Sequence, residues 1–159
     1  MNFIITNEIK LSQLDEIVDH MRGPRLWMPK FQYPDMNDWL QKVHSQLKSE
    51  TKKVVIAISR NVIIGSLVYQ KHLVSEMLEL KNLTVRPDMQ GRYLASFMLR
   101  NAEIEGVRDF AVNKVICDTK ANNLPVRALL EHSGYKLIGV VDLYRLSGGQ
   151  DVVYTKTVK

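Results

Sequence analysis

The sequence predicts a single α/β domain over residues 1–159, in which helices flank a mixed sheet. Runs of β type alternate with stretches whose apolar residues recur at helical spacing, in the order βααβββαβαββ. Proline, glycine or asparagine separates many of these runs, and no repeat, linker or low-complexity segment interrupts them. A chain of 159 residues, 45% apolar and 25% charged, has the length and composition of one globular domain.

A short strand and a helix open the chain. Residues 3–5 form a β-rich run, and we expect Ser12 to cap the helix that follows. Apolar residues recur at helical spacing from Leu14 to Met21, and the Gly-Pro pair at 23–24 ends this helix.

A second helix and a hairpin come next. We expect Asn37 or Asp38 to cap this helix, after a loop that proline punctuates. The β-rich runs at 54–58 and 62–68 flank the Arg-Asn pair at 60–61, which predicts a tight turn between two antiparallel strands.

Strands and helices alternate in the remainder of the chain. Strands are expected at 77–85, 114–117, 137–141 and 152–155, and helices at 91–110 and 124–132. Gly134 stands where a C-cap glycine would end the last helix. The two final strands are expected to form a hairpin across residues 147–149.

Composition and charge exclude several classes of protein. The 22 lysines and arginines against 17 aspartates and glutamates give a net charge of +5, which favours anionic ligands. The longest basic run is only the pair at 52–53, so a nucleic-acid partner is not expected. No apolar stretch approaches the roughly 20 residues of a membrane span, and no signal segment is visible. We therefore expect a soluble, cytoplasmic protein without a membrane partner, whose lone Cys117 is a buried strand residue.

The strand at 79–85, the loop after it and the next helix form a unit suited to anions. The start of a helix presents unpaired backbone N–H groups and the positive end of the helix dipole, and both attract phosphate. Gly91, Ala95 and Ser96 are small enough to let a ligand approach the backbone. The alternative is an ordinary helix start with small residues by chance.

Residues 83–99 read LTVRPDMQGRYLASFML. This run resembles the acetyl-CoA segment of the GNAT superfamily of N-acetyltransferases, with its pattern L-x-V-x-P-x-x-Q-G-x-G-x-G/A-x-x-L. Residues 123–135 are similar to the family's late segment, which leads from an asparagine through a helix to Gly-Phe. The resemblance implies a mostly antiparallel central sheet and acetyl-CoA as co-substrate, with no metal.

The same resemblance assigns roles in binding acetyl-CoA. Backbone groups of Leu83 and Val85 would bind the pantetheine arm as a pseudo-strand, and N–H groups from Gln90 to Ala95 would hold the pyrophosphate. Asn123 would reach the pantetheine from the far side of two splayed strands, or would simply cap a helix. The implied cofactor-binding residues are Leu83, Val85, Gln90, Gly91, Arg92, Tyr93, Leu94, Ala95, Ser96 and Asn123.

Two positions depart from the family's pattern. Tyr93 replaces the middle glycine, so a bulky side chain stands where the backbone normally approaches phosphate. Leu130 occupies the position of the tyrosine that acts in many members as general acid to the leaving thiolate. The candidate replacements, for which aromatic packing is the favoured interpretation, are Tyr135, Tyr144 and Tyr154.

Direct acyl transfer requires a base for the amine and a donor for the oxyanion. Glu79 lies at the position of the catalytic glutamate of the histone-acetylating members, and Glu76 is a second choice. Period-2 alternation predicts that Glu79, Lys81, Leu83 and Val85 share one face, although Glu79 is alternatively a solvated strand-edge carboxylate paired with Lys81. The resemblance makes the N–H of Leu83 the oxyanion donor.

The histidines carry no recognisable chemistry. They are scattered without ligand spacing or a nucleophile partner, so neither a metal site nor a covalent triad is expected. We expect them at the surface or at an interface, and only His132 has a weak link to the thiolate position. The four are His20, His44, His72 and His132.

The acceptor is less well defined. The loop between the first two helices would help to form its pocket, and its aromatic residues suggest a partly apolar amine while its cations argue against a polyamine. Packing of these aromatics onto the sheet is the favoured alternative. The residues concerned are Trp27, Phe31, Tyr33, Trp39, Arg22, Arg25 and Lys30.

The sequence therefore predicts an acetyl-CoA-dependent N-acetyltransferase of small-molecule, peptide or protein amines, either monomeric or homodimeric. A catalytically silent GNAT-like module that binds a ligand or partner remains the alternative. An RNA-associated acetylating enzyme rests on charge alone and ranks last.

Overall fold

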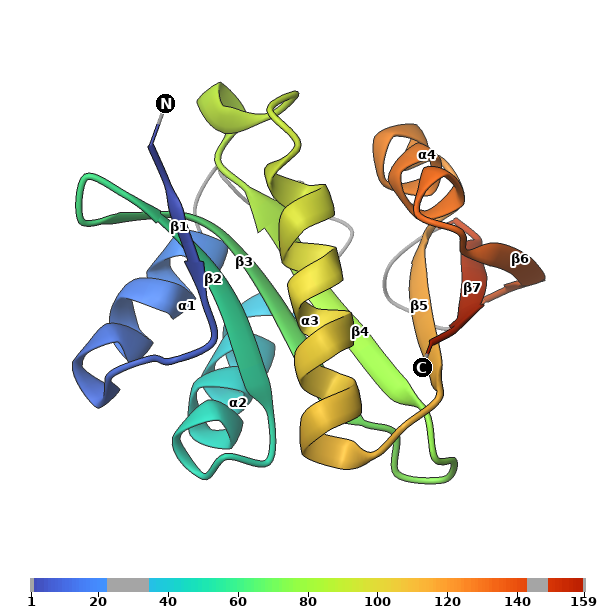
Figure 1. Ribbon diagram of the computed structural model, residues 1–159, viewed down its shortest axis with the longest axis horizontal. Helices are drawn as coiled ribbons and strands as arrows, with labels where there is room; N and C mark the ends of the chain where they lie inside the picture. Colours follow the sequence, from blue (N-terminus) through green and yellow to red (C-terminus); the bar gives the residue numbers. More distant parts are fainter. Residues whose placement is uncertain (1, 23–34, 143–148, 159) are drawn as a thin grey trace.

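The computed structural model describes residues 2–22, 35–142 and 149–158. The strands are β1 (Ile4–Thr6), β2 (Lys53–Ser59), β3 (Val62–Lys71), β4 (Leu78–Val85), β5 (Lys114–Lys120), β6 (Lys136–Val141) and β7 (Asp151–Thr157). The helices are α1 (Leu14–Arg22), α2 (Met36–Lys48), α3 (Leu94–Phe110) and α4 (Leu124–His132), with 3-10 turns η1 (Leu11–Gln13) and η3 (Pro87–Met89). Their order along the chain confirms the predicted βααβββαβαββ (Figure 1).

The seven strands found in the described residues form one sheet, in the order β1-β2-β3-β4-β5-β7-β6. Among these described strands, β4 and β5 pair in parallel and the other neighbouring pairs are antiparallel. The predicted mixed, mostly antiparallel sheet is therefore confirmed. The parallel pair lies in the middle of the sheet because α3 connects β4 to β5 as a crossover.

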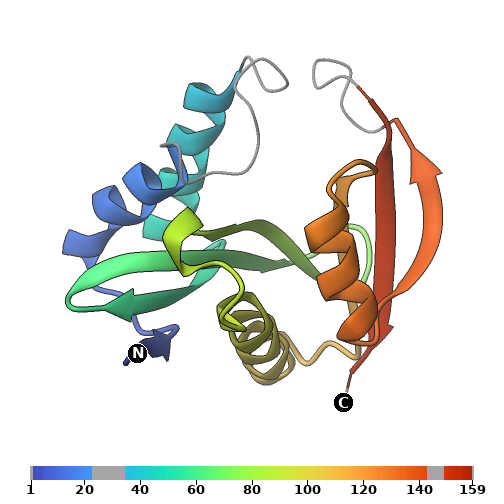
Figure 2. The ribbon, with the colours of Figure 1, turned by 90° about the horizontal axis from the view of Figure 1, so that it is seen from above.

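Helices cover both faces of the first four strands, with α1 and α2 on one side and α3 on the other (Figure 2). One core cluster joins α1 and α2 to β2 and β3, and a second joins α3, α4 and the sheet's other face. Four consecutive residues of β2, Val54 to Ala57, are at most 1% exposed. Their unbroken apolar run follows from burial on both faces.

Helix starts differ in detail from the sequence expectation. Ser12 lies inside η1 and does not cap α1. At the start of η1, the N–H of Lys10 donates to Oε1 of Gln13, at 2.8 Å. Helix α2 begins after Asp35, so Asn37 and Asp38 lie within its first turn. Several polar residues competed for each cap, and the sequence pattern alone did not separate them.

Other local predictions hold. Arg60 and Asn61 both have positive φ angles, of 50° and 61°, as the tight turn between β2 and β3 requires. Helix α4 ends before Gly134, whose φ of +89° suits a C-cap glycine. Strands β6 and β7 pair antiparallel, whereas residues 143–148 of their connection lie outside the described residues. Cys117 lies in β5 as predicted, but it is partly rather than fully buried.

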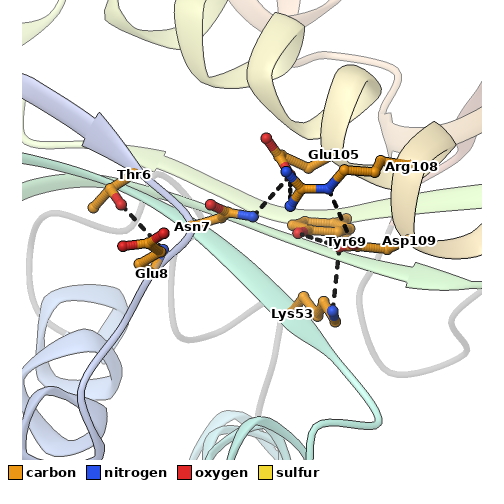
Figure 3. Close-up of polar contacts among 8 residues, drawn as sticks. All are labelled: Thr6, Asn7, Glu8, Lys53, Tyr69, Glu105, Arg108 and Asp109. Carbon is orange, nitrogen blue, oxygen red and sulfur yellow. Dashed lines mark hydrogen bonds and ion pairs between the residues drawn. The ribbon is translucent and has the colours of Figure 1, made fainter.

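A polar network fastens the C-terminal half of α3 to the sheet (Figure 3). Asn7 donates to Glu105 at 3.0 Å, and the Tyr69 hydroxyl donates to Asp109 at 3.3 Å. Arg108 pairs with both Glu105 and Asp109. Burial, together with the negative charge of Asp109, raises the pKa of Tyr69 to about 12, so its hydroxyl stays a donor. The network therefore anchors the C-terminal half of α3, and the helix residues that take part in it lie outside the first turn.

Candidate functional site

The parallel strands β4 and β5 separate after a short stretch of pairing. Leu78 to Leu80 pair with Val115 to Cys117, and no further residue pair joins the two strands. Beyond that point β4 stays with β3, and β5 stays with β7 as far as Lys120. Figure 1 shows β4 and β5 diverging toward the start of α3. One edge of each strand is thereby left unpaired, as the predicted splayed pair requires.

Leu83 and Val85 direct their backbone groups toward this opening. The N–H of Arg86 donates to the carbonyl of Ile64 at 2.8 Å, so Arg86 and Thr84 face β3. Alternate residues of a strand direct their N–H and C=O to opposite sides, so Leu83 and Val85 face β5. The Val85 carbonyl accepts a hydrogen bond from the Gln90 side chain, at 3.2 Å. Leu83 and Val85 therefore lie in an extended segment whose outer edge pairs with no other described strand.

A β-bulge in β4 reverses the side-chain alternation. The β3–β4 register shifts between Ser66 and Val68, and Asn82 has a φ of 60°. Leu83 and Val85 therefore pack with the α3-side core, whereas Thr84 faces α1.

The bulge makes one sequence prediction wrong. Glu79 and Lys81 do not share a face of the sheet with Leu83 and Val85. Glu79 and Lys81 lie on the α1 and α2 side of the sheet, because Leu78 and Leu80, which alternate with them, pack in the α3-side core. Period-2 reasoning does not detect the extra residue that a bulge inserts.

The start of α3 presents a row of unpaired backbone amides. The N–H of Phe97 donates to the carbonyl of Tyr93 at 3.1 Å. The N–H of Gln90, predicted as a donor to the ligand, instead donates to the carbonyl of Pro87 at 3.4 Å, and a turn at residues 90–91 involves the N–H of Arg92. In the described part of the chain, no acceptor engages the N–H groups of Gly91 and of residues 93–96, and no side chain caps this helix. A Cβ added at Gly91 would meet no atom within 4 Å, so the surroundings of the loop are open. Unpaired donors of this kind and the positive end of the helix dipole attract anions.

Tyr93 adopts the backbone conformation that the family's glycine would provide. Its φ of 63° and ψ of 7° lie in the left-handed region, and the residue is 77% exposed. Its ring therefore does not fill the helix start, and its N–H is one of the unpaired donors. The departure from glycine places strain on the backbone without closing the site.

Of the other predicted binding residues, Arg92 and Leu94 lie at the start of α3 and Asn123 lies at the start of α4. Arg92 is exposed beside the unpaired amides, whereas Leu94 is buried and can contribute only its backbone. Asn123 caps α4 by accepting from the N–H of Val126 at 3.4 Å, and its amide donates to Thr119 at 3.2 Å. The capping alternative is thus confirmed, and contact of Asn123 with a cofactor stays a prediction.

Glu79 is held by two neighbours in the middle of the sheet. Nε2 of Gln70 donates to Oε2 at 3.0 Å, and Nζ of Lys81 lies 2.9 Å from Oε1. Burial by itself would raise the pKa of Glu79, but these two partners outweigh it and hold the pKa below its ordinary value. Glu79 is therefore ionised at neutral pH. The pairing with Lys81 agrees with the alternative interpretation of Glu79 as a paired carboxylate. Glu79 is, however, half-buried in a central strand and does not lie at the edge of the sheet. Glu76, the second choice, is exposed.

No tyrosine in the described residues takes the vacant general-acid position. Leu130 is buried in the core. The Tyr154 hydroxyl donates to Glu131 and accepts from Arg127, both at 3.0 Å, so its proton is committed. Tyr135 is 3% exposed, and burial raises its pKa well above the ordinary range. Both tyrosines belong to the core, as the packing interpretation predicted. Tyr144 lies outside the described residues.

His20 contradicts the expectation of surface histidines. It is 1% exposed, and its Nε2 lies 2.7 Å from Oγ1 of Thr84, which in turn lies 2.9 Å from Oγ of Ser66. This buried chain links α1 to the strand segment between Leu83 and Val85. Nothing in the sequence pattern predicts it, because His20 and Thr84 are 64 residues apart. Within the described ranges, no cluster of three or more acidic, histidine or cysteine side chains could hold a metal ion.

Most of the predicted acceptor loop cannot be tested. Trp27, Phe31, Tyr33, Arg25 and Lys30 lie outside the described residues. Two flanking residues are described: Trp39 packs against the core between α1, α2 and the sheet, and Arg22 pairs with Asp19 at 2.9 Å. Among residues 2–22, 35–142 and 149–158, no helix is long and apolar enough to cross a membrane.

These features define a class of protein. A mixed sheet that opens at its parallel pair, beside a helix start with unpaired amides, is the arrangement implied by the resemblance to acyl-CoA-binding acetyltransferases. Residues 16–135 match the family described as Acetyltransferase (GNAT) family, and the chain belongs to this family. No curated protein matches the chain in sequence.

Solved structures share the fold at low sequence identity. An N-acetyltransferase from Staphylococcus aureus Mu50 is 14% identical with a TM-score of 0.78, and the match covers 100% of both chains. The ribosomal-protein-S18-alanine N-acetyltransferase from Escherichia coli is 16% identical with a TM-score of 0.77, over 99% of this chain and 95% of that one. The PaiA N-acetyltransferase from Thermoplasma acidophilum, in complex with coenzyme A, is 15% identical with a TM-score of 0.73, over 99% of each chain.

Proposed function

We propose that the protein is a single-domain N-acetyltransferase that moves an acetyl group from acetyl-CoA to the primary amine of a small molecule, peptide or protein. The observation that carries this proposal is the set of unpaired amides between Gly91 and Ser96, beside the unpaired edge of β4. A helix start with unpaired amides suits a diphosphate, and an unpaired strand edge suits a ligand with a series of amide groups. Acetyl-CoA contains both, because its pyrophosphate is followed by the two amides of the pantetheine arm. The coenzyme A bound by the Thermoplasma relative supports the same ligand.

Binding would use backbone more than side chains. The amides from Gly91 to Ser96 would hold the pyrophosphate, with Arg92 adding a positive charge. Leu83 and Val85 would pair with the amides of the pantetheine arm, because their backbone groups face the gap between β4 and β5. Asn123 would face the arm from the β5 side while keeping its role as the cap of α4.

Transfer would proceed by direct attack of the neutral amine on the thioester carbonyl. Glu79 would accept the proton of the amine, directly or through water, since its carboxylate is ionised at neutral pH. The N–H of Leu83, directed into the gap, would stabilise the developing oxyanion. The new C–N bond forms as the C–S bond breaks, and coenzyme A leaves as a thiolate.

The test begins with titration calorimetry of acetyl-CoA, followed by an amine library read by released thiol. Binding together with acceptor-dependent thiol release is expected. Arg92→Glu should weaken acetyl-CoA binding, whereas Lys48→Glu, the same charge reversal at the exposed end of α2, should not. Absence of binding at low salt would refute the proposal.

The second candidate is a silent module that binds coenzyme A without turnover. Leu130 favours it, because an aliphatic side chain in the core cannot protonate a thiolate. Binding without thiol release from any amine in the library would establish this alternative.

A further inference from the structure

A buried network of three polar side chains joins α1 to two strands of the sheet. Nε2 of His20 lies 2.7 Å from Oγ1 of Thr84 in β4, and this hydroxyl lies 2.9 Å from Oγ of Ser66 in β3. None of the three residues is more than 2% exposed, and the α1 residues Ile17 and Met21 belong to the apolar core on this side of the sheet. Because buried polar groups need their hydrogen bonds, the network depends on Thr84 standing opposite Ser66.

The bulge in β4 is what brings Thr84 opposite Ser66. On one side of the bulge Lys81 pairs with Val68, and on the other side Thr84 pairs with Ser66, which leaves one extra residue in β4. Asn82 lies in the bulge with a φ of 60°, in the left-handed region. A residue other than glycine keeps such a conformation when the surrounding structure imposes it. Contacts that hold Thr84 in place therefore also hold the bulge.

Without the bulge, the part of β4 that follows it would shift by one residue along β3. Leu83 would then stand opposite Ser66, and its N–H would turn from the gap between β4 and β5 toward β3. Thr84 would move to the other side of the sheet, beside Gly65, where Met98 packs closely. The register of β4 thus decides which of its N–H groups face the gap.

We propose that His20 is a positioning residue for acetyl-CoA binding and acyl transfer. Through Thr84, and together with Ser66, it holds the bulged register and so keeps the backbone groups of Leu83 and Val85 directed into the gap. The Thr84 hydroxyl meets both of its partners only in this register, so their hydrogen bonds favour it over the unbulged one. This inference rests on the proposed function, in which Leu83 supplies the oxyanion donor, and His20 itself does not touch the substrate.

Amide hydrogen exchange followed by NMR tests the register without turnover. In the wild type, the N–H of Leu83 should exchange fast because it pairs with no described strand, whereas β3 should protect that of Thr84. His20→Leu keeps a similar volume but removes the hydrogen bond, and the unbulged register should then predominate by about 10 to 1. Thr84 should lose its protection and Leu83 should gain about 10-fold, while Lys81, before the bulge, should not change. An unaltered pattern at Leu83 and Thr84 would overturn the proposal.

Ligand binding tests the consequence for the site. Because acetyl-CoA would bind the bulged register, its apparent affinity for His20→Leu and its kcat/KM should fall about 10-fold, with kcat close to that of the wild type. Affinity for ADP, which carries the pyrophosphate without the pantetheine arm, should not change. His20→Gln keeps a polar group in reach of Thr84 and should restore the wild-type values. An equal loss for ADP and acetyl-CoA would indicate a merely structural role and refute the assignment.

Two further variants separate the register from the stability of α1. Asn82→Gly in the His20→Leu background should recover most of the affinity for acetyl-CoA, because glycine adopts a positive φ without strain. Ile17→Val, which removes one buried methyl group from the same helix, is the matched control and should change neither the exchange pattern nor the affinity. A loss of acetyl-CoA affinity in Ile17→Val as large as that in His20→Leu would contradict a specific role of His20.

The two proposals fail in different ways. If His20→Leu shifts the exchange of Leu83 and Thr84 but the wild type binds no acetyl-CoA, the acetyltransferase function is refuted and the control of register by His20 stands. If the wild type and His20→Leu bind acetyl-CoA equally well, the positioning role of His20 is refuted alone.

Discussion

Replacing Tyr93 by glycine should stabilise the protein. A non-glycine residue in the left-handed region costs roughly 1–2 kcal/mol of folding free energy, which glycine would relieve. The greater conformational entropy of glycine in the unfolded chain offsets roughly 0.5–1 kcal/mol of that gain. Tyr93 is 77% exposed, so removing its ring sacrifices little burial. The net gain should be about 0.5–1 kcal/mol, which for a domain of this size raises Tm by about 1–4 °C.

Thermal unfolding followed by circular dichroism would measure this gain in a short series. Tyr93→Ala keeps the Cβ and the strained φ of 63°, so it should gain nothing, whereas Tyr93→Asn should lie between alanine and glycine. Equal stabilisation by alanine and glycine would show that the ring is unfavourable and that the backbone is not strained. Acetyl-CoA affinity of the glycine variant should stay equal or rise, because the amide of residue 93 is kept. A fall in affinity would place the ring in contact with the cofactor.

Three further substitutions test the site and its support. Glu79→Gln should lower kcat by about 100-fold with an unchanged acetyl-CoA KM, and an unaltered kcat would reject Glu79 as the base. Folding lowers the pKa of Glu79, so the ionised Glu79 carboxylate stabilises the folded state at pH values above its unfolded-state pKa. This stabilisation is lost as the pH falls through the folded-state pKa. Wild type should therefore lose more stability than Glu79→Gln between about pH 7 and about pH 3, measured by urea unfolding. Thr84→Val should cost about 1–3 kcal/mol in the same assay, since two buried polar partners lose their hydrogen bond; a change within experimental error would show that they find other partners. Gly106→Ala should destabilise by about 1–3 kcal/mol, because its Cβ would lie 2.4 Å from Leu78, whereas Gly139→Ala, with no atom within 4 Å, should be close to neutral.

Elements whose signals are local were predicted closely. Helix α4 covers residues 124–132 as expected, because its periodicity and the glycine that ends it lie within a few residues of each other. The turn at 60–61 is confirmed for the same reason. Caps were predicted less well, since neighbouring polar residues compete and the choice depends on how the preceding chain enters the helix.

The candidate site was predicted in part. The loop before α3 has the unpaired amides that the family pattern implied, because a helix start leaves its first N–H groups free in any context. The face of Glu79 relative to Leu83 was wrong because one inserted residue in β4 changes the alternation. Burial of His20 was not foreseen, since it depends on Thr84, which is 64 residues away in sequence.

The sequence by itself determined the number, order and type of the elements, together with the strand–loop–helix unit that marks the family. Hydrophobic period, glycine and proline act over a few residues, so their consequences do not wait for the rest of the chain to fold. Only the tertiary structure decided which groups meet on the α1 side of β4, because the bulge and the contact of α1 with Thr84 arise from packing between segments far apart in the chain.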